Sequence, residues 1–310
     1  MPNHTRRLIV FLLTGITLFA LLAFTPPKIP QKHYVQFQSV YELQEYLAWS
    51  PEKTPLIGAH RGGPMPGYPE NALETFEHTL TYAPCLLEID VRKTRDGRLV
   101  LMHDKTLDRT TTGKGPIGNY TYAELQQFQL VDPEGTVTPY KIPTLKEALL
   151  WAKGKAILQL DVKEPVTFEQ VVDSVELYGA EAYVVIITYN LRSAQRVHQL
   201  NSGLVISASA KGIEGTRRLL ASDIPARNLI AFVGVGEPNP EVYRMLHERG
   251  IRAILGTFGN LDRRAMRRGP QVYVRLLENG ADVLATDNVP LAARAIEAFI
   301  HQRMQLEPVR

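Results

Sequence analysis

Ionisable side chains gather at the ends of short apolar runs in this sequence. The run LIGA, residues 56–59, is followed directly by His60 and Arg61, and LVLM, residues 99–102, is followed by His103 and Asp104. Imidazole is the side chain that most readily exchanges a proton near neutral pH, so paired histidines are typical of acid–base catalysis. We therefore interpret His60 and His103 as an acid–base pair, provided that the fold brings the two run ends together.

Carboxylates occupy the same kind of position. Glu88 and Asp90 lie in LLEID, where alternation along a strand puts both on one face, and Asp161 lies in ILQLDVK. Three converging carboxylates repel one another and are costly to bury without a counter-charge. A divalent cation offsets that repulsion, and oxygen ligands favour Mg²⁺ or Ca²⁺ over zinc. The sequence therefore predicts one divalent cation, held by these three residues.

Permanent cations flank the acidic set. Arg61 follows directly on the first histidine, and Lys163 shares a strand face with the third carboxylate. Cations beside a metal need an anionic ligand, and phosphate suits both the guanidinium fork and the ammonium point charge. Gly62 and Gly63 would then let the backbone approach that ligand closely. Together these residues predict a site that handles a phosphate ester.

The apolar runs that carry these residues alternate with helical patterns from residue 54 onward. Nine runs are present: LIGAH, LLEID, LVLMHD, AILQLDV, YVVIIT, LVISAS, NLIAFV, IRAILG and DVLATD. Short apolar strands that alternate with amphipathic helices predict a parallel sheet covered by helices. Eight or so repeats within about 250 residues favour a (β/α)₈ TIM barrel, an α/β fold whose active site lies at the carboxyl ends of the strands. No GxGxxG or GxxxxGK[ST] motif supports an open nucleotide-binding sheet.

The ninth run has a local explanation. The segment KTRDGR separates LLEIDV from LVLMHD, and its Asp96-Gly97 pair is a strong tight-turn signal. We therefore expect a hairpin here rather than a helical crossover, with Asp90 opposite Met102 or His103. This pairing brings the second histidine beside the carboxylates.

The N-terminal part differs from the rest. The 18 residues from Leu8 to Thr25 carry no charge and are preceded by Arg6 and Arg7. We assign residues 1–27 to a transmembrane signal anchor, with a cleaved signal peptide as the alternative. The arginines would stay in the cytoplasm, which puts the globular part outside it, periplasmic or extracellular, anchored or secreted. Residues 28–53 are expected to be a tether with a short helix, residues 54–302 the barrel, and residues 303–310 a tail.

Composition places the chain among globular proteins, with 45% hydrophobic and 22% charged residues in a total of 310. The 35 basic and 32 acidic residues give a net charge of +3, too small and too scattered to favour nucleic acid as a partner. No feature indicates an obligate protein partner. Cys85 is the single cysteine, which excludes an intramolecular disulfide and a cysteine-based zinc site.

Each polar residue also has a purely structural interpretation. A histidine at a strand end is often a satisfied structural residue, and Asp104 and Asp287 can equally serve as caps for the segments that follow. The recurrence of polar groups at the same end of several strands is what favours a functional site.

These stretches resemble the glycerophosphodiester phosphodiesterase family, relatives of the phosphatidylinositol phospholipases. The resemblance runs from Ile57 to Ile296 and rests on AHRGG, YPENALETF, LLEIDVRKTRDGRLVLMHDKTLDRTTTGKGPIGNYTYAEL, IPTLKEAL, LQLDVKEP and GADVLATDNVP. It implies a TIM barrel that uses a divalent cation to hydrolyse glycerophosphodiesters to glycerol 3-phosphate and an alcohol.

The resemblance also implies roles for individual residues. The implied catalytic pair is His60 and His103, and the implied phosphate contacts are Arg61 and Lys163. The implied metal ligands are Glu88, Asp90 and Asp161, while Glu70 and Asn71 of PENA support the His-Arg turn. Our further supporting candidates are Asp104, Phe258 and Asp287.

Three positions depart from the family pattern. Asp161 stands where glutamate is usual, Ala72 replaces the threonine of PENT, and Phe258 lies where the family carries Trp-Thr-Val-Asn. Because the tryptophan is missing, the alternative to a simple glycerophosphodiester is a lysophospholipid, in a phospholipase D-like reaction, or a sugar phosphodiester. A barrel that binds phosphodiesters without cleaving them, and a membrane-tethered scaffold, are the alternatives outside the enzyme class. Attack by the substrate's own hydroxyl through a cyclic phosphate and attack by water both fit the sequence.

Overall fold

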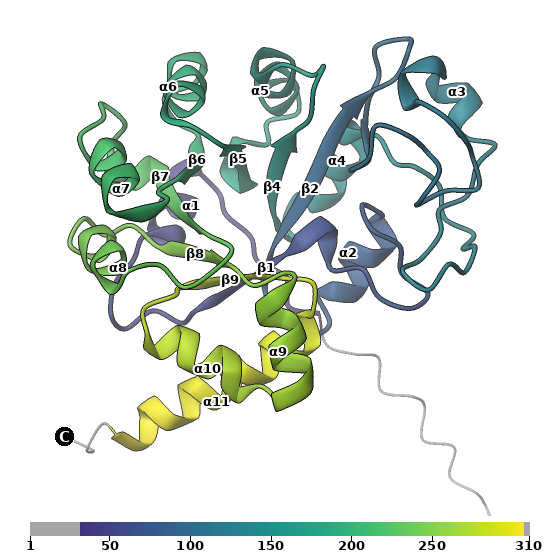
Figure 1. Cartoon of the computed structure of the whole chain (residues 1–310). Helices are drawn as coiled ribbons and strands as arrows, with labels where there is room; N and C mark the ends of the chain where they lie inside the picture. Colours follow the sequence, from purple (N-terminus) through teal and green to yellow (C-terminus); the bar gives the residue numbers. More distant parts are fainter. Residues whose placement is uncertain (1–31, 307–310) are drawn as a thin grey trace, which may run out of the picture. The chain divides into compact units, whose positions relative to one another are not determined.

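The apolar runs form the strands of a closed barrel in the computed structural model, which describes residues 32–306 (Figure 1). The parallel strands are β1 Leu56–Ala59, β2 Cys85–Lys93, β4 Ile157–Val162, β5 Val184–Thr188, β6 Val205–Ser209, β7 Leu229–Gly234, β8 Ala253–Gly256 and β9 Val283–Thr286. Strand β1 pairs in parallel with both β9 and β2, which closes the barrel. The predicted (β/α)₈ barrel is confirmed. The predicted signal or anchor segment lies outside the described residues.

Helices surround the barrel as an outer layer (Figure 1). They are α2 Leu73–Thr79, α3 Tyr122–Leu125, α4 Leu145–Ala152, α5 Phe168–Leu177, α6 Leu191–Leu200, α7 Gly212–Leu220, α8 Pro240–His247, α9 Asn260–Arg268, α10 Gln271–Glu278 and α11 Val289–Leu306. Helices α4 and α5 begin at Thr144 and Thr167, whose side chains accept backbone N–H groups in capping boxes. Helix α2 begins after Ala72, which offers no side-chain cap.

The predicted hairpin is also confirmed. Strand β3, Leu99–Leu101, pairs antiparallel with β2, and the ladder continues where Met102 N–H donates to the Asp90 carbonyl at 2.9 Å. Beyond it, a long segment with its own small core around Leu107 and Leu125 packs beside the barrel. It contains η2 Ile117–Asn119 and α3, the latter far out from the barrel in Figure 1. His103 lies at the start of this segment, two residues past β3, and its carbonyl accepts hydrogen bonds from Arg92 of β2.

Helix α1, Val40–Leu47, is the short helix expected in the tether, and it closes the amino end of the barrel. Its Leu43 and Leu47 are fully buried among the first inward-facing strand residues, such as Leu56 and Ile157. Figure 1 shows this helix lying behind the ring of strands. The active-site end is therefore the open end of the barrel.

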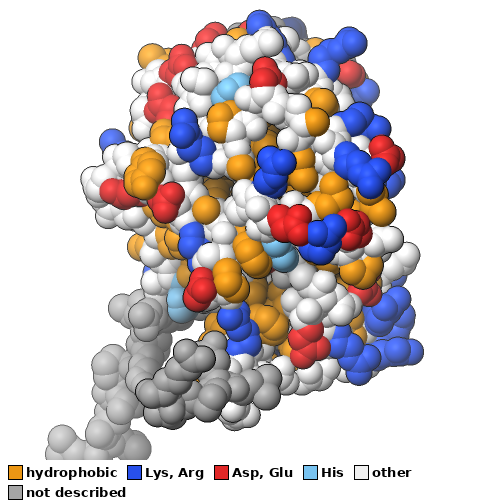
Figure 2. Space-filling view, turned by 90° about the vertical axis from the view of Figure 1, so that its left-hand side faces the viewer, with side chains coloured by type: hydrophobic (Ala, Val, Ile, Leu, Met, Phe, Trp, Pro, Cys, Tyr) orange, Lys and Arg blue, Asp and Glu red, His pale blue; other side chains and the backbone are white. Residues whose placement is uncertain are grey.

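Charges on the surface are mixed rather than sorted. On the face in Figure 2, basic and acidic side chains are interspersed, with hydrophobic side chains visible between them. None of the helices within residues 32–306 combines the length and apolar character that crossing a bilayer requires. Helix α11 continues to Leu306, past residue 302, where the sequence analysis put the end of the barrel.

Candidate active site

A cavity of about 930 Å³ opens at the carboxyl ends of the strands. Small residues on adjacent strands make room for it: a Cβ on Gly58 of β1 would lie 3.3 Å from Cα of Ala285 of β9. The sequence-predicted residues that line the cavity are His60, Arg61, Glu88, His103, Asp161, Lys163 and Phe258. The remaining candidates, Glu70, Asn71, Asp90, Asp104 and Asp287, bond to members of that set.

The three acidic candidates converge as the strand alternation predicted. Asp90 of β2 and Asp161 of β4 are direct neighbours in the parallel register, and Glu88 lies on the same face of β2. One oxygen from each of the three lies within 4.8 Å of the others. Asp161 Oδ1 is buried without a hydrogen-bond partner among the described residues, which leaves an acceptor free for a ligand.

Charge in this cluster is only partly balanced. Lys163 Nζ lies 2.9 Å from Asp90 Oδ1 and 2.5 Å from Asp161 Oδ2. Burial opposes ionisation of Asp90, yet the Lys163 ammonium and the Asn71 amide hold its pKa below the usual range. Burial, followed by the charges of Asp90 and Asp161, raises the pKa of Glu88 well above its usual range. The Lys163 charge and the Arg61 N–H therefore offset only part of the repulsion at Glu88.

Each predicted histidine has one ring nitrogen on a carboxylate. His60 Nδ1 lies 2.6 Å from Asp287 Oδ1, and His103 Nδ1 lies 2.8 Å from Asp104 Oδ1. Asp287 does not act as the cap of α11, because Asn288 accepts the Leu291 N–H instead. Each aspartate contacts Nδ1 of a candidate catalytic histidine, a position that suits orientation of the ring. In both rings Nε2 remains available to a ligand.

Phe258 lies against one of these rings. Its ring stacks on that of His60 with centroids 4.5 Å apart and 17° between the planes. Phe258 also lines the cavity, so it presents an apolar surface beside the histidine.

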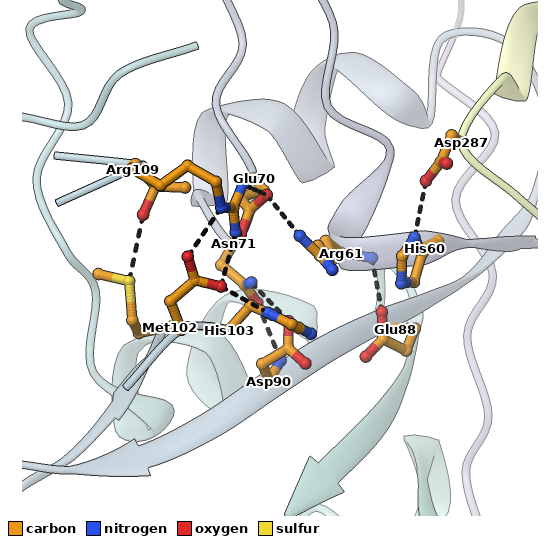
Figure 3. A network of polar contacts seen from close by, with 12 residues as sticks. His60, Arg61, Glu70, Asn71, Glu88, Asp90, Met102, His103, Arg109 and Asp287 are labelled. Atoms are coloured by element: carbon orange, nitrogen blue, oxygen red, sulfur yellow. Dashed lines mark hydrogen bonds and ion pairs between the residues drawn. The ribbon is translucent and has the colours of Figure 1, made fainter. Parts of the chain in front are cut away.

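The His-Arg turn is held by the residues that the resemblance named (Figure 3). Arg61 Nη1 donates to Glu70 Oε2 at 2.9 Å, and its backbone N–H donates to Glu88 Oε2 at 2.6 Å. The Asn71 N–H donates to the Arg61 carbonyl, while its side chain bonds Asp90 at both the backbone and the carboxylate. The PEN motif therefore ties the turn to the acidic cluster.

The two glycines of this turn are required by the packing around them. Gly62 and Gly63 both have φ +82°, and a Cβ on Gly62 would lie 2.2 Å from Cε1 of Phe76. A Cβ on Gly63 would lie 2.8 Å from Oγ1 of Thr79. Since the glycines face α2, the structure requires them for backbone conformation and helix packing. The expectation that they also let the backbone approach a phosphate ligand stays a prediction.

Comparison with known proteins agrees with this geometry. The profile of the Glycerophosphoryl diester phosphodiesterase family matches residues 60–291. The chain belongs to this family. It is accordingly a phosphoric diester hydrolase with a phosphodiester as substrate.

Individual relatives extend the match. A glycerophosphodiester phosphodiesterase of Bacillus altitudinis is 29% identical over 202 residues, which cover 62% of this chain and 81% of the relative. A crystal structure of a glycerophosphoryl diester phosphodiesterase from Parabacteroides distasonis is similar with TM-score 0.81 and 37% identity, covering 90% of this chain and 96% of that one. An Oleispira antarctica phosphodiesterase, solved with the product sn-glycerol-3-phosphate, shares the fold with TM-score 0.61 and 20% identity, covering 84% of this chain and 100% of that one.

Sequence reasoning missed Arg109 in this glycerophosphodiester phosphodiesterase site. Its guanidinium donates to Asp104 from Nε at 2.7 Å and from Nη2 at 2.9 Å. It also donates to Glu70 from Nη1 and Nη2, both at 2.9 Å (Figure 3). Hydrogen bonds from Arg109 are the main reason that the pKa of Asp104 lies far below its usual range. Arg109 thereby joins the support of His103 to that of Arg61. Its place inside the long quoted stretch LDRTTTG was the signal that could have found it.

Tyr189 was missed as well. It follows β5 directly, lines the cavity and donates its hydroxyl to Asp161 Oδ2 at 2.5 Å. Burial of the phenol, then the charge of Asp161, raises the pKa of Tyr189 above its usual range, so the hydroxyl is a stable donor. Its position one residue past an apolar run was the available signal, the same one that selected His60.

Proposed function

We propose that this phosphodiesterase hydrolyses glycerophosphodiesters to glycerol 3-phosphate and an alcohol, with a divalent cation and with His60 and His103 as the acid–base pair. The observation that carries the proposal is the pair of histidines, each on an aspartate, at one cavity with three converging carboxylates. Family membership supports the phosphodiester substrate.

The donor set fits a hard cation. Glu88, Asp90 and Asp161 offer only oxygen ligands, which suits Mg²⁺ or Ca²⁺ better than softer metals. The free, buried Oδ1 of Asp161 and the unbalanced charge at Glu88 are what a bound cation would satisfy. When bound, such an ion supplies Lewis-acid polarisation of the phosphoryl oxygens.

The protein's own groups account for the proton movements. Arg61 and Lys163, both at the cavity wall, hold the phosphate by its non-bridging oxygens. One histidine takes the proton of the attacking hydroxyl as its oxygen bonds to phosphorus. The other gives a proton through Nε2 to the alcohol oxygen as its bond to phosphorus breaks. The attacking hydroxyl belongs either to water, which gives glycerol 3-phosphate directly, or to the glycerol group, which gives a cyclic phosphate that water then opens with the two histidine roles reversed. Asp287 and Asp104 hold the rings in place through Nδ1.

A lysophospholipid is the second candidate substrate, cleaved with release of the lipid phosphate. One side of the cavity, formed by β7 and by the residues that follow β7 and β8, favours it because Phe232, Val235 and Phe258 are apolar and surround Gly256. At about 930 Å³ the cavity also leaves space beyond that of a glycerol phosphate.

A product-release assay tests the proposal. The purified full-length protein in detergent is offered glycerophosphocholine, glycerophosphoethanolamine or lysophosphatidylcholine, each with Mg²⁺, Ca²⁺ or EDTA. We expect metal-dependent release of glycerol 3-phosphate from the first two substrates, or of lysophosphatidic acid from the third, and none in EDTA. Binding without release under every condition would instead indicate a barrel that binds phosphodiesters without cleaving them.

We also propose that the barrel is anchored outside the cytoplasm by the uncharged segment Leu8–Thr25 behind Arg6 and Arg7. We expect the protein to stay in the membrane pellet after alkaline carbonate washing and to be digested by protease added to intact cells or spheroplasts. Recovery in the soluble fraction with its N-terminus shortened would indicate a cleaved signal peptide and a secreted enzyme.

A further inference from the structure

Tyr189 lies at the mouth of the cavity, where its hydroxyl makes an unusual contact. The residue is 66% exposed, yet its hydroxyl turns inward to Asp161, which is only 4% exposed. The next residue, Asn190, caps α6 by accepting the Ser193 N–H, so the backbone following Tyr189 is fixed. An exposed phenol ordinarily bonds to water, so this inward contact with a buried carboxylate suggests a role in the site.

The two oxygens of Asp161 have different surroundings. Oδ2 accepts from the Tyr189 hydroxyl and lies 2.5 Å from Lys163 Nζ, while Oδ1 is buried without a partner among the described residues. Hydrogen bonds to one oxygen of a carboxylate fix the rotation of the group and so set where its second oxygen points. Groups around a metal site orient the metal ligands in this way.

Lys163 alone does not fix that direction. Its ammonium is shared, because it also lies 2.9 Å from Asp90 Oδ1 and so is drawn toward β2. The Tyr189 hydroxyl comes from the end of β5, on the other side of β4, and bonds Asp161 alone. Donors from two sides hold the carboxylate against rotation.

We propose that Tyr189 is a positioning residue, which holds Asp161 Oδ2 so that Oδ1 is directed at the divalent cation. This inference rests on the metal site in the proposed function. Tyr189 acts through Asp161, so its loss changes the geometry of the site while leaving the three carboxylates in place.

Positioning makes a prediction that differs between ions. Mg²⁺ requires near-ideal octahedral geometry, whereas Ca²⁺ accepts variable coordination. A less well-oriented Asp161 therefore weakens Mg²⁺ binding more than Ca²⁺ binding. A merely structural role of Tyr189 would not change the ratio of the two affinities.

The test is a calorimetric titration of the full-length, metal-free protein with Mg²⁺ and with Ca²⁺, in the absence of substrate. For Tyr189→Phe we expect Mg²⁺ affinity to fall by about 10-fold, the lower end of the range for groups that orient metal ligands. Ca²⁺ affinity falls less, and Tm of the metal-free protein stays within a few degrees of the wild type. Tyr41→Phe is the matched control, because Tyr41 is also 66% exposed but lies on α1 at the opposite end of the barrel.

The outcomes separate this inference from the metal site itself. If the wild-type protein binds Mg²⁺ but Tyr189→Phe binds it equally well or more tightly, the positioning role is overturned and the metal site stands. The same holds if Tyr189→Phe loses equal affinity for both ions. If the wild-type protein binds neither ion, the metal site and the role of Tyr189 are overturned together.

Discussion

His103→Gln is expected to lower kcat by about 10²- to 10⁴-fold, the usual contribution of a positioned general acid or base. Glutamine is similar in size and polarity but cannot exchange a proton near neutral pH. The side chain of His103 is 32% exposed and not part of the apolar core, so Tm should change little. Steady-state kinetics with saturating metal, together with a thermal melt, measure both quantities.

The size of this effect follows from how firmly the ring is oriented. Nδ1 of His103 bonds Asp104, and Arg109 fixes Asp104 with two hydrogen bonds while also holding Glu70 (Figure 3). Charge-assisted bonds of this kind are short and directional. Nε2 of His103 is therefore presented to the cavity in one orientation, which a replacement side chain does not reproduce.

His247→Gln is the matched control. His247 Nε2 also lies 2.8 Å from a carboxylate oxygen, Oδ2 of Asp282, but its ring stacks on Trp49 away from the cavity. This variant should keep wild-type kcat even if Tm falls. A kcat for His103→Gln close to that of the wild type would remove His103 from the catalytic pair.

The same experiment assigns the acid and the base when His60→Gln is added. A substrate with a nitrophenol leaving group needs no proton on departure, so replacing the general acid costs little with that substrate. Replacing the base costs about the same with both substrates. The variant whose defect shrinks with nitrophenol therefore marks the general acid.

Much of this site was predictable because it depends on local patterns. Period-two alternation put Glu88 and Asp90 on one face of β2, and the Asp96-Gly97 turn narrowed the residue opposite Asp90 to Met102 or His103, of which the structure has Met102. Since parallel strands deliver their carboxyl ends to one rim, strand order alone brought His60 and Asp161 to one cavity.

The parts of the site that were not predicted depend on contacts between residues far apart in the sequence, which no local pattern encodes. Arg109 lies in an irregular segment and reaches Glu70, 39 positions earlier, while His60 finds Asp287 227 positions later. Packing of α1 across the barrel end likewise follows from its two leucines meeting inward residues of eight strands. Such contacts depend on loop paths and packing, which periodicity does not specify.

Glu88→Gln is expected to have opposite effects on stability with and without metal. Burial and the neighbouring carboxylates raise the pKa of Glu88 well above the unfolded value. The native metal-free protein therefore holds that proton more tightly than the unfolded chain, and its stability falls as pH rises above about 4.3, the ordinary glutamate value. Glutamine carries no charge and can still accept the Arg61 N–H, which now donates to Glu88 Oε2 at 2.6 Å.

In EDTA at about pH 8, Glu88→Gln should therefore melt at a higher temperature than the wild type, by about 2–4 °C for each kcal/mol gained. The difference should shrink as the pH falls and vanish well below about 4.3, where the wild-type carboxyl is protonated in both states. Glu74→Gln is the control, because Glu74 is an exposed glutamate on α2 and its replacement should leave Tm unchanged.

Saturating Mg²⁺ or Ca²⁺ should reverse the order. A ligand at 100 times its Kd stabilises the native state by about 2.7 kcal/mol, which the wild type gains and Glu88→Gln, missing one carboxylate ligand, largely does not. Turnover should be lost in the same variant. A variant that is less stable than the wild type in EDTA at about pH 8 would show that the charge of Glu88 is already balanced without a cation. Without a cation, repulsion among the carboxylates predicts that Glu88→Gln raises Tm, whereas with a bound cation the lost ligand predicts that it lowers Tm. A change in sign of this Tm difference when metal is added therefore tests whether the acidic cluster binds a positive ion.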